Sequence, residues 1–322
     1  MNFKKIILII LAIIIVLGAG ALIFKTGNKN ESGNNKIQVV SSNFASYDFL
    51  RAIIGDNSNV ELTFLIGPGK EAHSYDPTAQ DLIKIQNADL FVYIGGEMEK
   101  WSDKVLDSIE DKEMKIICIS EDVEQIEEQE VDGAEEEQEE EEEEGAFDEH
   151  IWTSPSNAIK MVNSLEKAME EIDSQNSEKY RENADKYIAQ IQEVDKQIQE
   201  IVDNKVRDRL IFADKMPMQY FIDYYDLKVS AAFSGCSTET EPSANTIAYL
   251  ENKAREEKIP VILYIELNNG RVAKIIAEDI GEGCEAMQIQ TLHNLSLDDF
   301  NNSETWVSLM KRNIEVLKKA LQ

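Results

Sequence analysis

Short apolar runs that alternate with helical patterns are the feature that most restricts how this 322-residue chain can fold. Alternation of this kind is typical of βαβ units, in which helices connect parallel strands and cover the sheet. It predicts the α/β class. Eight runs rich in β-branched and aromatic residues predict strands, at Ile37–Val40, Val60–Ile66, Leu90–Ile94, Lys115–Ile119, Leu210–Ala213, Lys228–Phe233, Val261–Ile265 and Met287–Thr291.

A long amphipathic helix separates the first four strands from the last four. Its apolar positions repeat at alternating steps of four and three, which forms one continuous stripe on a helix. We therefore predict two lobes, 36–174 and 206–322, each a mostly parallel four-stranded sheet with flanking helices, joined by one connecting helix over 175–205. The same spacing suits a coiled-coil seam, so dimerisation through this helix is the alternative to the monomer that we expect. The stripe consists of Tyr180, Ala184, Tyr187, Ile191, Val194, Ile198 and Ile201.

The first 24 residues predict an export signal or a membrane anchor. Lys4 and Lys5 precede an apolar run from Ile6 to Phe24, which would span roughly 28 Å as a helix at about 1.5 Å per residue. A small-residue stretch at 19–21 offers a cleavage site, so both a cleaved signal and an uncleaved anchor remain open. We expect a polar stalk over 25–35 and an extracytoplasmic location for the remainder.

The chain is strongly acidic. Its 62 acidic residues against 32 basic ones give a formal charge of −30, and nucleic acid is therefore not an expected partner, because phosphate binding needs a surplus of Lys and Arg. Much of the imbalance lies in residues 121–149, which contain no basic residue. We expect an acidic loop there, either as a solvated spacer or as a negative field that collects cations.

The three histidines of the chain all follow predicted strands. His73 follows the second strand, His150 follows the fourth after the acidic run, and His293 follows the eighth. Ligands of open parallel sheets bind outside the carboxyl ends of the strands, so these loops can converge between the lobes. Three neutral imidazoles suit Zn²⁺ and leave room for one carboxylate or water.

The fourth ligand is less determined by the sequence. Asp214 follows the fifth predicted strand and can serve as a ligand or cap the helix expected from about Met218. Glu266, after the seventh strand, and Cys236, after the sixth, are the alternatives. Cys284 precedes the eighth strand and so belongs at the opposite edge of the sheet, and we predict no disulfide between Cys236 and Cys284.

Three segments resemble a known family, the extracytoplasmic solute-binding proteins of zinc and manganese ABC transporters, the TroA-like cluster A-I proteins. The resemblance covers roughly residues 36–321. Its most specific element is the Gly-Pro-Gly-Lys-Glu-Ala-His-Ser-Tyr-Asp-Pro-Thr run that contains His73. The Asp-Glu-His-Ile-Trp segment contains His150, and Glu-Thr-Glu-Pro-Ser at 239–243 is similar to the segment ahead of a second-lobe helix.

The resemblance implies a metal-binding protein that captures zinc in a cleft between two lobes and delivers it to an ABC transporter permease. Manganese is the second metal that it allows. It implies the ligands His73, His150, Asp214 and His293. The third position departs from the family pattern, because an ungapped count from Tyr220-Phe221 reaches Lys215, and one inserted residue restores Asp214.

Two other classes of function remain as alternatives. One is an extracytoplasmic zinc hydrolase that uses Glu71 or Glu149 as general base, although the chain contains no His-Glu-x-x-His or Gly-x-Ser-x-Gly motif. The other is a surface adhesin or assembly protein that uses the long helix. We expect no enzyme, because a site with four protein ligands has no open position for water.

Overall fold

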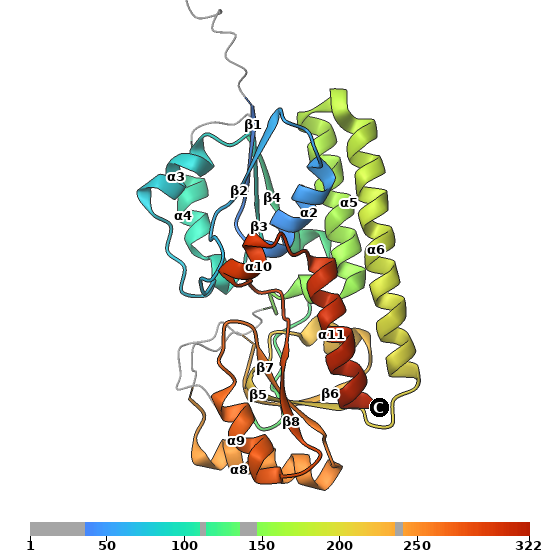
Figure 1. Ribbon diagram of the computed structural model, residues 1–322. Helices are drawn as coiled ribbons and strands as arrows, with labels where there is room; N and C mark the ends of the chain where they lie inside the picture. The colour runs from blue at the N-terminus through green and yellow to red at the C-terminus, as the bar shows by residue number, and fades with distance from the viewer. Residues whose placement is uncertain (1–35, 110–113, 136–146, 236–240) are drawn as a thin grey trace, which may run out of the picture. The chain divides into compact units, whose positions relative to one another are not determined.

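The computed structural model describes residues 36–109, 114–135, 147–235 and 241–322, and residues 37–322 form one compact unit. Figure 1 shows two parallel four-stranded sheets, with strand orders β2-β1-β3-β4 and β6-β5-β7-β8. This confirms the predicted α/β class. The first sheet contains β1 Ile37–Ser41, β2 Val60–Phe64, β3 Leu90–Tyr93 and β4 Lys115–Cys118; the second contains β5 Arg209–Lys215, β6 Lys228–Phe233, β7 Val261–Ile265 and β8 Glu285–Ile289.

Two strands differ from the prediction in a way that affects the candidate site. β5 continues two residues beyond Ala213, because its pairing with β6 resumes at Lys215 after a register shift. Asp214 therefore lies inside a strand, and the predicted helix-capping role for it is wrong. β8 ends at Ile289, and Thr291 is held by Glu266 after the strand has ended.

Helices surround both sheets and begin where the sequence supplies caps. Thr78 and Asp81 form a capping box at α3, and Thr305 and Ser308 form one at α11. The helices are α2 Phe44–Ile54, α3 Ala79–Gln86, α4 Trp101–Asp107, α5 Pro155–Ile172, α6 Ser177–Asp203, α7 Gln219–Tyr224, α8 Ala244–Glu257, α9 Arg271–Ile280, α10 Leu297–Asn301 and α11 Trp306–Leu321, with short 3-10 turns η1 Glu97–Glu99, η2 Ile119–Asp122, η3 Ile151–Thr153 and η4 Ser174–Asn176.

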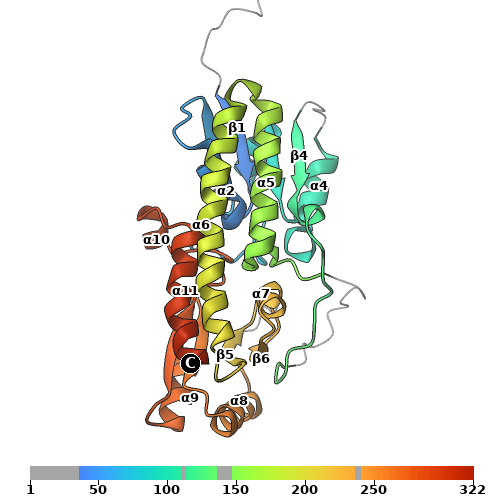
Figure 2. The same cartoon turned by 90° about the vertical axis from the view of Figure 1, so that its right-hand side faces the viewer.

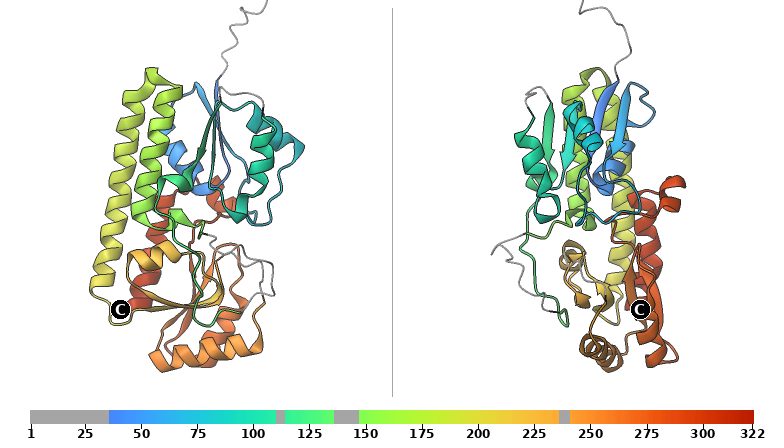
Figure 3. Two further views of the ribbon diagram at one scale, coloured as in Figure 1. Left: turned by 180° about the vertical axis from the view of Figure 1, so that it is seen from behind. Right: turned by 90° about the vertical axis from the view of Figure 1, so that its left-hand side faces the viewer.

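The long helix α6 packs along α5, α2 and α11 (Figures 2 and 3). Every residue of the predicted apolar stripe is buried in it. These side chains join one hydrophobic core with residues of both sheets, such as Val39 of β1 and Phe212 of β5. The chain itself covers the stripe, which removes the seam that a coiled-coil dimer would need. The monomer and the lobe boundaries 36–174 and 206–322 stay predictions.

The first part of the acidic segment is a strap between the two sheets. It leaves the first sheet after β4, and Figure 3 shows this green stretch passing from one sheet to the other. Asp132 bridges to Ser230 of the edge strand β6 in parallel fashion, the Ala231 amide donates to Asp132 O, and the Glu135 amide donates to Ala232 O. Residues 131–135 thus extend the second sheet. The prediction of a solvated loop is therefore wrong for these five residues. The six glutamates 139–144 lie outside the described residues.

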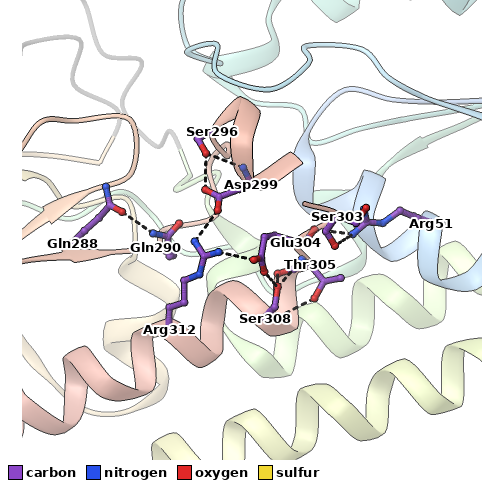
Figure 4. A network of polar contacts seen from close by, with 10 residues as sticks. All are labelled: Arg51, Gln288, Gln290, Ser296, Asp299, Ser303, Glu304, Thr305, Ser308 and Arg312. Atoms are coloured by element: carbon purple, nitrogen blue, oxygen red, sulfur yellow. Dashed lines mark hydrogen bonds and ion pairs between the residues drawn. The ribbon is translucent and has the colours of Figure 1, made fainter. Parts of the chain in front are cut away.

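The connection from β8 to α11 returns from the second sheet to the first and carries His293. Phe300 of α10 contacts the rings of Tyr47 and Phe64. Arg51 of α2 donates to the Glu304 carbonyl oxygen at 2.8 Å, and Figure 4 shows Arg51 beside this turn. Within the same network Arg312 of α11 binds the carboxylates of Asp299 and Glu304. The connection that carries His293 is therefore fixed to α2, β2 and α11.

Several predictions fall outside the described part of the chain. These are the membrane segment at 6–24, the stalk at 25–35 and Cys236, so the absence of a Cys236–Cys284 disulfide stays a prediction. Cys118 and Cys284 are free thiols. Within the described residues, no helix combines the length and the apolar character needed to cross a membrane.

Candidate metal centre

The structure brings the three histidines of the chain together. Among the described residues, His73, His150 and His293 form a group whose ligand atoms all lie within 4.8 Å of one another. Their ring centroids are 5.6 Å apart for His73 and His150, 4.9 Å for His73 and His293, and 5.3 Å for His150 and His293. Two of these residues follow strands of the first sheet and one follows a strand of the second.

His73 lies in the loop between β2 and α3, which is hydrogen-bonded to the His293 loop. Gly67 and Gly69 have φ of 77° and 75°, a backbone region that favours glycine and allows the loop to turn. The Gly69 amide donates to Leu295 O at 2.9 Å, and the Asn294 side chain donates to Gly67 O at 3.1 Å. These bonds join the two loops, so His73 and His293 are positioned as a pair.

His150 is fully buried directly before η3 and α5, and Asp148 orients its ring. The His150 amide donates to Asp148 Oδ1 at 2.8 Å, and the ring Nδ1 lies 3.1 Å from the same oxygen. With Nδ1 engaged, Nε2 is the nitrogen left to bind a metal. Trp152 packs edge-on against the His150 ring and donates its indole N–H to Thr291 O at 3.0 Å.

Glu266 positions His293. Its two carboxylate oxygens accept hydrogen bonds from the Thr291 amide at 2.7 Å, the Thr291 hydroxyl at 2.8 Å and the His293 amide at 3.0 Å. Glu266 was an alternative for the fourth ligand. Its oxygens instead hold the backbone of the His293 loop.

Asp214, the fourth predicted ligand, is not a member of the histidine group. Its carboxylate accepts from the Lys215 amide at 2.9 Å and from the Ile265 amide at 3.3 Å, which ties β5 to β7. Burial raises its pKa despite these hydrogen bonds. The next residue, Lys215, is linked to the histidines through Glu71, since its Nζ lies 3.7 Å from one Glu71 oxygen and the other oxygen lies 3.6 Å from His293 Nδ1.

The electrostatics of the cluster favour neutral imidazoles at two positions. Burial lowers the pKa of His73 to about 2, assisted by the charges of His293 and His150. Burial, His150 and Lys215 lower the pKa of His293 well below its usual value. Burial also lowers the pKa of His150, but the charge and hydrogen bond of Asp148 outweigh it, and the net shift is upward.

All three Nε2 atoms are buried and have no hydrogen-bond partner among the described residues. Buried polar atoms in proteins are nearly always hydrogen-bonded, so three such atoms in one place need an explanation. An imidazole Nε2 with a free lone pair is a good ligand for Zn²⁺. The chemistry of the three atoms therefore fits a cation with a preference for nitrogen.

Asp148 is not among the predicted site residues, and Glu71 is predicted only as a possible general base, although a short pattern marks both. Glu71 and Asp148 each stand two residues before a histidine, and each accepts from the amide of that histidine, at 3.4 Å for His73 and 2.8 Å for His150. An acid at this spacing folds back onto the histidine backbone. The acid-x-His repeat was therefore a usable signal for residues around the metal.

Comparison with known proteins gives consistent similarities. The family described as zinc-uptake complex component A, periplasmic (ZnuA) matches residues 39–320. The zinc-binding lipoprotein AdcA of Streptococcus pneumoniae is 30% identical over 299 residues, 93% of this chain, and the chain spans 58% of that protein. The high-affinity zinc uptake system protein ZnuA of Bacillus subtilis is 30% identical over 305 residues, which cover 93% of this chain and 94% of that protein.

A solved structure shows the same fold. The Zn(II)-bound ZnuA-like domain of Streptococcus pneumoniae AdcA matches with a TM-score of 0.72 and 28% sequence identity. The match covers 89% of this chain and 99% of the domain. The likeness therefore includes both sheets and the helices around them.

Proposed function

The chain belongs to the family of the periplasmic zinc-uptake component A, and from this membership we propose that it captures Zn²⁺ outside the cytoplasm and delivers it to the permease of an ABC transporter. The observation that carries the proposal is the convergence of three buried Nε2 atoms without hydrogen-bond partners among the described residues. Three loops from two sheets supply them. A metal bound there would contact both halves of the protein.

We assign His73, His150 and His293 as the protein ligands. Asp214 is not a member of the histidine group, so its carboxylate would have to move toward the histidines to complete a tetrahedral site. The fourth position therefore falls to water or to Asp214 after such a movement. Imidazole-rich sites suit zinc better than manganese, which prefers carboxylates, so zinc is the proposed cargo and manganese the second choice.

Transport accounts for the site better than catalysis does. Of the two bases that a hydrolase could use, Glu71 is paired with Lys215, and Glu149 accepts from the Met98 amide at 2.7 Å. Each carboxylate thus already has a structural partner. The adhesin alternative relied on the stripe of α6, which lies in the core. We therefore propose a binding protein that is not an enzyme.

Zinc titration of single variants tests the assignment. His73→Ala, His150→Ala and His293→Ala should each lower zinc affinity by more than the roughly 10–100-fold that changes around a metal site cost, because each removes a direct ligand. Competition with a chromophoric chelator measures the dissociation constant. Glu256→Ala, on the exposed face of α8, is the control and should bind like the wild type. Wild-type affinity in any histidine variant would remove that residue from the site.

A further inference from the structure

A lysine side chain reaches the histidine cluster from the end of β5. The side chain of Lys215 is 8% exposed, and its Nζ lies 3.7 Å from Glu71 Oε2. The other oxygen of that carboxylate, Oε1, lies 3.6 Å from His293 Nδ1. The Glu71 carboxylate therefore stands between the ammonium and the ring of His293. A positive group beside a site for a dication is an arrangement that needs a reason.

Strand pairing and a hydrogen bond fix the backbone of Lys215. After a register shift that follows Phe212, the last residue of β5, Lys215, pairs with β6 again. The Lys215 amide also donates to Asp214 Oδ1 at 2.9 Å. Glu71 comes from the β2–α3 loop of the first sheet, so the ion pair joins the two sheets. A cavity of about 300 Å³ borders it, lined among others by Glu241, Glu266 and Arg271.

The field of Lys215 reaches the proposed ligands. Its ammonium is separated from the ring of His293 by one carboxylate, with Nζ 3.7 Å from Glu71 Oε2 and His293 Nδ1 3.6 Å from Glu71 Oε1. A fixed positive charge at this place disfavours a dication bound to the histidines, since like charges repel. Glu71 offsets that effect, because its carboxylate contacts both the ammonium of Lys215 and the ring of His293. The structure thus places opposed charges beside one proposed site.

We propose that Lys215 limits the zinc affinity of the histidine site and speeds zinc release, and that Glu71 compensates its charge. The proposal rests on the proposed function, because it assumes that zinc binds His73, His150 and His293. Repulsion by a fixed ammonium destabilises the bound state without removing a ligand. A protein that must hand its cargo to a permease needs this kind of limit on affinity.

Neutralising Lys215 in the full chain tests the proposal, with zinc affinity and zinc dissociation rate as readouts. Lys215→Met should lower the dissociation constant and slow dissociation by on the order of tenfold, because the repulsion is lost. Lys215→Arg keeps the charge and should behave like the wild type. Lys228→Met is the matched control, since Lys228 also lies in the second sheet but is 61% exposed and paired with Asp208.

The Glu71 variant completes a double-mutant cycle. Glu71→Gln should weaken zinc binding by on the order of tenfold in the wild-type background, where Lys215 is left without its carboxylate, and much less in the Lys215→Met background. If Glu71→Gln weakened zinc binding equally in both backgrounds, the proposal that Glu71 compensates the charge of Lys215 would be overturned. Unchanged or weaker zinc binding by Lys215→Met would overturn the role of Lys215. If Lys215→Met does not fold, Lys215→Gln takes its place with the same expected result.

Failure of this inference can be separated from failure of the proposed function. Loss of zinc binding in His73→Ala together with unchanged affinity in Lys215→Met would leave the histidine site intact and reject the limiting role. Wild-type zinc binding in His73→Ala would reject the site itself. Each outcome is read from the same competition titration.

Discussion

At the scale of single residues, Asp148 has the clearest effect on the proposed ligands. It contacts both the amide and the ring Nδ1 of His150, and it is itself buried. A carboxylate on Nδ1 fixes the ring orientation and makes Nε2 a stronger ligand. The same carboxylate also raises the pKa of His150, so it stabilises the competing proton as well.

Asp148→Asn should lower zinc affinity roughly 10–100-fold at neutral pH, because the amide supports the imidazole less well than a carboxylate does. The deficit should shrink at lower pH, since the variant also loses the charge that keeps a proton on His150. Isothermal titration at pH 7.5 and pH 6 measures both effects. Asp103→Asn on the exposed side of α4 is the control. If the loss of zinc affinity in Asp148→Asn were the same at both pH values, Asp148 would have no role in the protonation of His150.

Glu99 is a second buried acid, in the turn η1 that follows β3. One of its oxygens accepts from the amides of Ile94 and Gly95, and the other has no hydrogen-bond partner in the described part of the chain. Burial raises its pKa from 4.5 to about 6, against the hydrogen bonds of Ser42, Gly95 and Ile94 that lower it. The folded protein therefore holds this proton more tightly than the unfolded chain.

The sign of the pH dependence follows from that difference. As pH rises through 4.5 to about 6, the unfolded chain ionises first, and the free energy of unfolding falls by about 2 kcal/mol. Glu99→Gln stays neutral, so its stability relative to the wild type should increase by that amount between pH 4 and pH 7.5. Urea unfolding at the two pH values measures it, with Glu97→Gln on the same turn as an exposed control. If the difference in unfolding free energy between Glu99→Gln and the wild type did not change with pH, the raised pKa of Glu99 would be refuted.

At the scale of elements, the strap over residues 131–135 depends on Asp132. Its carboxylate accepts from Arg209 at 3.0 Å and Ser230 at 2.9 Å, and also from the Tyr249 hydroxyl. Gly133 has φ of 89° and lies so close to the Tyr249 ring that any larger residue there would have to displace this ring. The β6 edge of the second sheet is thereby covered by an acidic segment from the other half of the chain.

Asp132→Ala should release this strap. Because the Asp132 side chain is 42% exposed, we expect a loss of only about 1 kcal/mol. The amides of Ala231 and Glu135, which bond across the strap, should then exchange hydrogen roughly fivefold faster. Hydrogen exchange measured by mass spectrometry reports this. Glu130→Ala, an exposed change in the same segment, should leave both amides unaffected, and equal exchange in Asp132→Ala would contradict the anchoring role.

Periodic elements were predictable from the sequence, whereas the elements set by distant pairing were not. The α6 stripe and the strands β6 and β7 match their predicted bounds closely, because burial imposes a visible spacing on their residues. The strap pairs with Ser230, 98 residues away, and no local pattern specifies such a partner. The same holds for the end of β5, where a register shift against β6 decides that Asp214 lies in a strand.

The candidate site also has one part that the sequence predicts and one part that it does not. The positions of the histidines after predicted strands indicated their convergence, since the topology of parallel sheets brings these loops to one edge. The ion pair of Lys215 and Glu71 joins the end of β5 to the loop between β2 and α3, and no spacing rule gives the distance between these two segments. Supporting residues around a metal are therefore harder to predict than the ligands themselves.

At the scale of the whole molecule, zinc should stabilise the folded protein. A ligand that binds only the folded state adds about 2.7 kcal/mol at a hundredfold excess over its dissociation constant. The rise in melting temperature should shrink as pH falls, because His150, whose pKa is raised, must lose its proton to bind, whereas His73 and His293 are already neutral. Differential scanning fluorimetry with and without a chelator measures the shift. An equal shift at pH 5 would indicate a site made of carboxylates.

The last helix has a consequence for how the protein is made. Trp306 at the start of α11 is fully buried, and its amide donates to Asp48 of α2, a residue 258 positions earlier. The first half of the chain therefore cannot close its core while α11 is still in the ribosome, since contacts between distant segments form late. Secretion machinery commonly threads chains that have not yet folded. For a protein that we propose to act outside the cytoplasm, a fold that needs the sixteen-residue helix α11 keeps the nascent chain in that state until this helix has been made.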